Sequence, residues 1–242
     1  MNMRKMISLF MLGCLVLSCN LPKDAIHLKP TNYVDLTVSE PSDIAINPLK
    51  KDHFFVASDD GYLAEINING ETTRIKEFDA YDVEGVYANT EFVYAVDEFT
   101  RNITVFNHDL EVLRTINIPY GGGRNRSYEA FTYNEAKKMF LLFTEKNPVY
   151  LFELTEDLQV YNQINLGKIA RDISAASFYN GFVYLLSDED KLIFKLDPNT
   201  YEILQKWYVP VVNPEGLAFT ENGKVLIISD DRERLYYFNS LD

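Results

Sequence analysis

The chain has 242 residues, enough for one large domain or two small ones, and 47% of them are hydrophobic, with only 11 glycines and 9 prolines. This composition is typical of a packed globular protein and argues against a disordered chain. The formal net charge of −13 argues against a nucleic-acid partner, because phosphate binding requires a basic surface. The 16 tyrosines and 16 phenylalanines favour β-strands.

The first 18 residues predict a lipoprotein signal peptide. Arg4 and Lys5 form a charged start, and residues 6–18 form an apolar run too short to span a bilayer. The run ends in the sequence VLSC, which resembles the cleavage motif of bacterial lipoproteins, so we expect cleavage before Cys19 and a lipid on its thiol. The alternatives are lipidation of Cys14, an ordinary signal peptide or an uncleaved anchor.

The export signal predicts a domain outside the cytoplasm. Cys14 and Cys19 are the only cysteines, so the folded part can form no disulfide and no thiolate metal site. Residues 19–31, which contain two prolines, are typical of a tether, and we expect the domain over residues 32–242. The expected location is the bacterial cell envelope, at the outer or plasma membrane, facing the periplasm or the cell surface.

From residue 32 onward the chain repeats. An acidic residue, an apolar one and Glu-Gly occur at residues 82–85, and a close variant occurs at residues 213–216. Weaker copies occur at three other places. Aligned on the third position, the anchor residues of the five copies are Ser42, Glu84, Glu129, Ser174 and Glu215. They are about 41–45 residues apart, the length of one four-stranded propeller blade.

Each repeat contains short runs of strand-forming residues separated by turn residues, the pattern of an antiparallel meander. The first and third units have predicted second strands at residues 54–57 and 139–143. The second unit has predicted strands at residues 85–88, 92–96, 103–106 and 112–118. The fourth unit has them at residues 175–179, 182–186, 192–196 and 202–209.

The fifth unit has only three predicted strands, at residues 216–219, 225–228 and 235–238. The missing fourth strand is available at residues 33–38. Pairing this segment beside residues 235–238 would close the ring and remove two sheet edges. We therefore predict an all-β fold, a five-bladed β-propeller of four-stranded antiparallel blades whose ring is closed by the N-terminal strand.

In such a blade the start of the first strand and the end of the second lie at the same edge. Acidic residues lie at both places in most units. The second strands are followed by Asp59, Asp97-Glu98, Glu145, Asp188 and Asp230. We expect both sets to surround one face of the disc, where carboxylates without matching cations repel one another unless a cation lies between them.

Calcium is the cation that this pattern favours, because it accepts six to eight oxygen ligands in irregular geometry. Zinc prefers histidine or cysteine, and the three histidines show no ligand spacing. The candidate metal ligands are Glu84, Glu129 and Glu215, with Asp172 as a fourth candidate. In the alternative interpretation, these residues bind backbone amides and hold adjacent blades together.

The phrases EPSDIAINP, DVEGVY, YAVDE, FTEKNP, DISAASF and NPEGLAF, in this order and spacing, resemble the SdiA-regulated (YjiK-like) family of bacterial envelope proteins. The resemblance covers essentially everything from residue 32 onward. It implies a five-bladed propeller with a calcium site, and it extends distantly to NHL-repeat and phytase-type propellers. The chain departs from the pattern at Ser42 and Ser174, which replace glutamate, and at Ala130, which replaces glycine.

Two functions fit these features. The first is a monomeric, calcium-stabilised module that is anchored to a membrane and binds a ligand or partner at its acidic face. The second is a calcium-dependent hydrolase of the lactonase or phosphoesterase type, in which Asp97 or Glu98 acts as the base. No nucleophile elbow is visible, and the face lacks the many basic residues that a phytase needs, so we favour binding.

Overall fold

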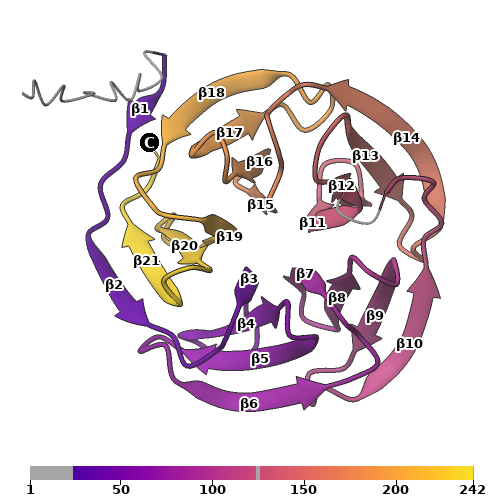
Figure 1. Ribbon diagram of the computed structural model, residues 1–242, viewed down its shortest axis with the longest axis horizontal. Helices are drawn as coiled ribbons and strands as arrows, with labels where there is room; N and C mark the ends of the chain where they lie inside the picture. The colour runs from indigo at the N-terminus through magenta and orange to yellow at the C-terminus, as the bar shows by residue number, and fades with distance from the viewer. Residues whose placement is uncertain (1–23, 124–125, 242) are drawn as a thin grey trace, which may run out of the picture.

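The computed structural model describes residues 24–123 and 126–241. Within these ranges the regular elements are strands β1 to β21, and they form five sheets arranged around a common axis (Figure 1). The protein is therefore an all-β, five-bladed propeller, and this prediction is confirmed. No described helix is long and apolar enough to cross a bilayer. The predicted signal peptide and Cys19 lie outside the described residues.

Each blade is an antiparallel meander that runs outward from the axis. Blade 1 contains β3 (Pro41–Ile46), β4 (His53–Ser58), β5 (Tyr62–Asn67) and β6 (Thr72–Glu77). Blade 2 contains β7 (Val83–Ala88), β8 (Val93–Asp97), β9 (Asn102–Phe106) and β10 (Val112–Asn117). Blade 3 contains β11 (Tyr128–Asn134), β12 (Met139–Thr144), β13 (Val149–Leu154) and β14 (Val160–Gly167).

Blades 4 and 5 recruit strands from the N-terminal segment. Blade 4 contains β15 (Ala175–Tyr179), β16 (Phe182–Ser187), β17 (Leu192–Leu196) and β18 (Ile203–Tyr208), with β1 (Ile26–His27) added outside β18. Blade 5 contains β19 (Pro214–Phe219), β20 (Val225–Ser229), β21 (Arg234–Phe238) and β2 (Asn32–Asp35).

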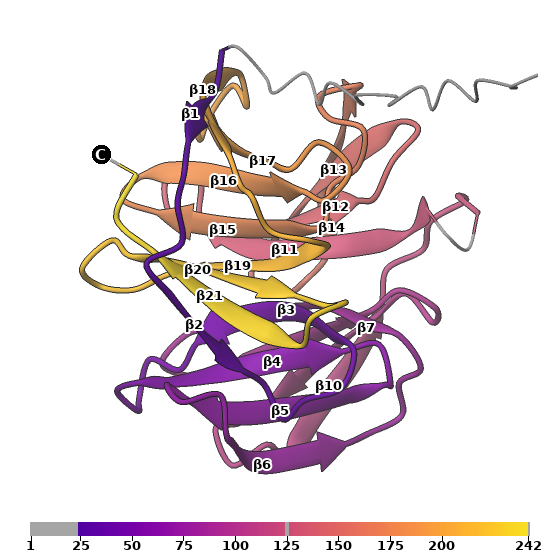
Figure 2. The ribbon, with the colours of Figure 1, turned by 60° about the vertical axis from the view of Figure 1, so that its left-hand side comes forward.

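Strand β2 closes the ring, as the repeat predicts. It pairs antiparallel with β21, and the two strands lie side by side in Figure 2. The pairing ends at Asp35, earlier than the predicted residue 38. The reason is that the chain then turns toward blade 1, where the amide of Thr37 donates to the carbonyl of Gly70 at 3.2 Å. The closure therefore joins blade 5 to blade 1 through backbone hydrogen bonds.

Strand β1 has no counterpart among the predicted strands. Ile26 and His27 pair parallel with Trp207 and Tyr208 of β18, and the rings of His27 and Tyr208 lie 5.1 Å apart. A two-residue strand is too short to show periodicity. It lies within the segment predicted as a tether, so contacts with the propeller begin before residue 32.

The hydrophobic core lies between neighbouring blades, because each sheet buries both faces against the next. Phe131 and Phe140 of blade 3 stack at 5.2 Å, and the ring of Tyr94 of blade 2 packs 4.9 Å from Phe140. Each fully buried aromatic side chain of this kind stabilises the fold by roughly 1.5–3 kcal/mol. The alternating apolar residues of the predicted strands therefore fix the angle between blades as well as the blades themselves.

Gly216 allows the inner strands of blades 5 and 1 to approach each other closely. A Cβ atom at this position would lie 3.0 Å from both Cα of Asp43 and the backbone nitrogen of Ile44. Because backbone atoms cannot rotate away, we expect Gly216→Ala to lower the free energy of unfolding by about 1–3 kcal/mol in urea denaturation. Gly121→Ala is the control, since its Cβ would meet no atom within 4 Å. Equal stability of the two variants would contradict close packing here.

Candidate metal centre

The anchor residue of the repeat is a β-bulge in four of the five blades. In blade 2, for example, Val83 pairs with Asp97 and Gly85 pairs with Val96, so Glu84 has no partner. The residues skipped in this way are Ser42, Glu84, Glu129 and Glu215. A bulge residue is released from the ladder and its side chain is re-aimed. The repeat signature therefore marks a bulge at the start of the inner strand in blades 1, 2, 3 and 5.

The acidic residues after the second strands are held beside these bulges by one recurring backbone hydrogen bond. The amide of the acidic residue donates to the carbonyl two positions before the anchor. The bonds are Asp59 to Glu40 at 3.1 Å, Glu98 to Asp82 at 2.8 Å, Glu145 to Ser127 at 3.0 Å and Asp230 to Asn213 at 3.2 Å. The blade geometry thus fixes the two acidic sets next to each other.

The two sets meet in a cavity of about 230 Å³, which we call the acidic mouth. It is lined by nine acidic residues: Asp59, Glu84, Glu129, Glu145, Asp172, Asp188, Glu189, Glu215 and Asp230. All four predicted metal ligands are among them, so the structure brings together side chains that are up to 131 residues apart in sequence.

Three of the four predicted ligands have the same environment. The carboxyl groups of Glu84, Glu129 and Glu215 are half-buried and lie among other carboxyl groups: that of Glu84 shares a hydrogen bond with Asp82, and that of Glu129 with Glu98. Burial, followed by the charges of Asp59 and Asp82, raises the pKa of Glu84 well above its usual range. Burial and neighbouring carboxylates likewise raise the pKa of Glu129, and that of Glu215 to about 8. The negative charges of these carboxyl groups therefore repel one another.

Asp172 has a different environment. Its Oδ1 accepts a hydrogen bond from the Ser187 hydroxyl, and its two carboxylate oxygens lie 3.1 and 3.2 Å from the amide nitrogen of Glu189. Burial raises the pKa of Asp172, but the bond from Ser187 opposes that shift. This carboxylate organises the turn between β16 and β17, which is the alternative role that the sequence left open.

The two serine anchors tie adjacent blades together. The hydroxyl of Ser42 donates to the carbonyl of Val83 in the next blade, and that of Ser174 donates to the carbonyl of Pro214 at 2.9 Å. Serine therefore replaces glutamate where the bulge or its equivalent serves a blade junction. The three glutamate anchors, in contrast, line the acidic mouth.

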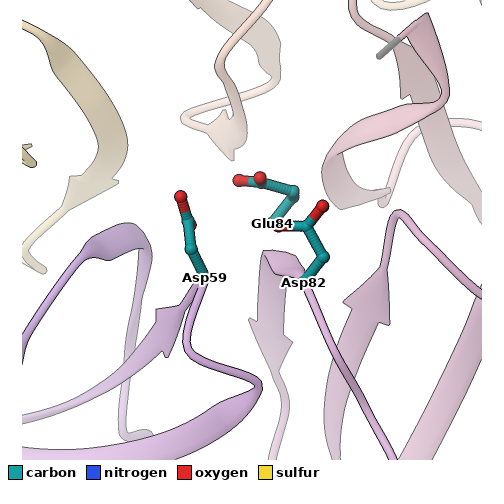
Figure 3. A group of neighbouring side chains, drawn as sticks. All are labelled: Asp59, Asp82 and Glu84. Carbon is teal, nitrogen blue, oxygen red and sulfur yellow. The ribbon is translucent and has the colours of Figure 1, made fainter. Parts of the chain in front are cut away.

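Asp59 and Asp82 were not among the predicted ligands, yet they lie against Glu84. One carboxylate oxygen from each of the three residues lies within 4.8 Å of the others, and the side chains point toward one another in Figure 3. Burial, followed by the charges of Asp82 and Asp230, raises the pKa of Asp59 to about 7. Each residue belongs to one acidic set of the repeat, but only the contact between blades 1 and 2 shows that they meet.

Asp97 and Glu98, the two candidate bases, have structural partners. Asp97 Oδ2 accepts from the amide of Tyr81 at 2.9 Å, and its Oδ1 accepts from the amide of Thr100 at 3.0 Å. Glu98 Oε1 accepts from the amide of Ser127 at 2.9 Å, and burial raises the pKa of Glu98 to about 7. Asp97 therefore fixes its turn and is not placed to accept a proton from a substrate.

Lys146 is the single basic residue among the described residues that line the acidic mouth. Its ammonium pairs with Glu145 and lies 3.4 Å from Glu189. The lining contains no histidine or cysteine. An array of oxygen donors from several blades fits a hard divalent cation such as calcium and does not fit zinc.

Comparison with known proteins agrees with this architecture. None of the curated proteins matches the chain. The crystal structure of Myxococcus xanthus glutaminyl cyclase is similar, with a TM-score of 0.73 and 13% identity over 90% of this chain and 99% of that one. At that identity the likeness shows the fold alone. The model of the SdiA-regulated family matches residues 18–239. The chain therefore belongs to the SdiA-regulated family, as the repeat phrases predict.

Proposed function

We propose that this protein is a calcium-binding propeller of the bacterial envelope, held at a membrane by a lipid on Cys19, which binds a ligand or partner at its acidic mouth. The observation that carries the proposal is the convergence of Glu84, Glu129 and Glu215, each on a β-bulge, in one cavity. Bulges cost ladder hydrogen bonds, so three bulges that each aim a glutamate into one charged cavity support a functional requirement.

Electrostatics supports a bound cation. Each of these glutamates has its pKa raised by burial and by neighbouring carboxylates, so full ionisation near neutral pH is unfavourable without a positive charge. A divalent cation would supply that charge, and Asp59 and Asp82 would add oxygen donors beside Glu84. Calcium fits better than magnesium, because magnesium requires near-ideal octahedral geometry.

Isothermal titration of metal-free residues 20–242 tests the proposal. Calcium should bind saturably and magnesium more weakly. Glu84→Gln and Glu215→Gln should each weaken calcium binding about tenfold or more, since an amide lacks the negative charge of a ligand carboxylate. Glu202→Gln, an exposed residue just before β18, is the matched control and should bind like the wild type. Absence of saturable calcium binding by the wild type would contradict the proposal, and the acidic mouth would then be a charged surface without a metal site.

The proposed anchor would hold the propeller close to the bilayer. Strand β1 begins at Ile26, seven residues after Cys19. Seven residues span at most about 25 Å when fully extended. We expect mass spectrometry of the membrane fraction to find diacylglycerol on Cys19 and an N-terminus that begins there. A Cys19→Ala variant that still sediments with membranes would contradict this mode of anchoring.

Binding is favoured over catalysis by the placement of the acidic groups. The carboxylate of Asp97 is engaged by two backbone amides, and Oε1 of Glu98 accepts the amide of Ser127. The hydrolase alternative needs a base that is free to take a proton from water or substrate. The glutaminyl cyclase likeness supplies no catalytic residue for this chain, since it shows the fold alone.

A further inference from the structure

A second cavity, of about 500 Å³, lies between blades 3 and 4, and we call it the seam cleft. It is formed by the segment that links β14 to β15, the turn between β16 and β17, and the strands β17 and β18. The lining residues used below are Lys168, Arg171, Asp190, Leu192, Phe194 and Lys206, and Glu189 is shared with the acidic mouth. The volume falls within the range of small-molecule sites.

The seam cleft gathers basic side chains on a protein whose net charge is −13. Lys168, Arg171 and Lys206 line it, against the two acidic residues Glu189 and Asp190. Lys206 also pairs with Asp24, so the cleft is close to neutral, whereas the acidic mouth beside it is strongly negative. An anion is repelled less at a near-neutral cleft with basic side chains than at the negative surface around it.

Arg171 is held in place for anion recognition. Its Nε lies 2.6 Å from Oδ1 of Asp190, and its backbone amide donates to Oδ2 of the same residue at 2.9 Å. Within the described chain its terminal nitrogens donate to no residue. A guanidinium that is fixed through one nitrogen presents the others as a preorganised fork for a carboxylate or phosphate. Lys168 is exposed and has no ion pair with a described residue.

The floor of the seam cleft is apolar. Leu192 and Phe194 are 7% and 2% exposed and belong to the core cluster of blades 3 and 4. Ile169 and Ala170 of the linking segment pack against the same cluster. The cleft therefore combines a basic edge with a hydrophobic floor, which matches a ligand that has one anionic group and an apolar body.

We infer that the seam cleft binds an organic monoanion, a carboxylate or a phosphodiester that carries an apolar chain or ring. The anionic group meets Arg171 and Lys168, and the apolar body lies against Ile169 and Ala170, which are only partly buried. Polyphosphates are excluded by Glu189 and Asp190, which would repel additional negative charges. The site adjoins the acidic mouth at Glu189, and its occupancy does not require calcium.

The same chemistry could come from a soluble acid or from a lipid headgroup. Lys206 Nζ lies 3.7 Å from Oδ2 of Asp24, so the chain emerges from the propeller beside the cleft, five residues after Cys19. A lipid on Cys19 would bring the seam cleft close to the bilayer surface. The experiment therefore contains one arm for each source.

Titration of metal-free residues 20–242 with decanoate tests the inference, with decanol and decylammonium as neutral and cationic probes of similar length. Decanoate should bind saturably and at least about tenfold more tightly than either probe, since it alone carries a negative charge that can pair with Lys168 and Arg171. The variant Lys168→Gln/Arg171→Gln should bind decanoate about tenfold more weakly. Lys224→Gln, an exposed residue before β20, is the control and should not change binding.

Sedimentation with vesicles distinguishes the two sources. Binding to phosphatidylglycerol vesicles but not to phosphatidylcholine vesicles, lost in Lys168→Gln/Arg171→Gln, assigns the anion to a lipid headgroup. Decanoate binding without vesicle binding assigns it to a soluble acid. The inference is overturned if the protein binds neither decanoate nor phosphatidylglycerol vesicles, or if Lys168→Gln/Arg171→Gln binds them as the wild type does. A negative result here leaves the calcium titration unaffected, because metal is absent from this assay.

Discussion

Removal of residues 20–38 should destabilise the propeller by about 3–6 kcal/mol, because Leu36 and Val38 leave the core and each contributes roughly 1.5–3 kcal/mol. The two side chains are 6% and 2% exposed and pack with Leu235 in the cluster between blades 5 and 1. The deletion also strips β21 of its partner strand and leaves an open sheet edge. We therefore expect a large loss of stability, accompanied by aggregation.

Urea denaturation and light scattering measure this effect. Deletion of residues 20–27 is the control, because it removes β1 while it leaves β2 and its pairing with β21 intact. The control should lose far less stability than the longer deletion, since β1 contributes only two paired residues. If both deletions have the melting temperature of the parent protein, the N-terminal strand does not close the ring.

The metal-free protein should become less stable as pH rises from about 4 to about 8, and calcium should reverse that trend. Burial raises the pKa of Glu215 to about 8 and that of Asp59 to about 7, whereas unfolded carboxyl groups titrate near 4. Between these values the folded state binds more protons than the unfolded state. Stability is therefore highest below the unfolded pKa and is lost as pH rises through the folded pKa.

Because the carboxyl groups repel one another, the total loss of unfolding free energy should be on the order of several kcal/mol. The contribution of groups at the solvent-open rim of the acidic mouth is smaller, because water screens their charges. Calcium binds the deprotonated form, so its stabilisation should grow over the same interval. At a hundred times its dissociation constant, calcium should add ~2.7 kcal/mol. Thermal melting at pH 5, 6.5 and 8, with and without calcium, measures both trends.

The variant Glu84→Gln/Glu215→Gln separates repulsion from metal binding. Glutamine retains the volume of glutamate but carries no charge, so the metal-free double variant should be more stable than the wild type at pH 8 and should respond little to calcium. A double variant that is destabilised at pH 8 without metal would show that the two glutamates act as structural hydrogen-bond acceptors instead. A wild type whose stability is flat from pH 5 to pH 8 would contradict the electrostatic account of the acidic mouth.

The sequence by itself determined the number of blades, the family and the side of the disc on which the carboxylates gather. These features are local and periodic: the repeat of about 41–45 residues sets the blades, and the anchors Glu84, Glu129 and Glu215 mark equivalent positions. The closure by the N-terminal strand also followed from the number of predicted strands. The fifth unit has only three, and one additional strand is predicted before the first unit.

Only the tertiary structure decided which acidic residues face one another. Asp59 meets Glu84 across the junction of blades 1 and 2, where Asp82 of blade 2 also lies. Asp172 instead bonds the turn between β16 and β17, and Ser42 bonds the next blade. Spacing cannot separate these outcomes, since all of these residues occupy the same edge of their blades. A repeat fixes which edge a residue occupies, but the hydrogen bonds and contacts that use or free its side chain form between blades.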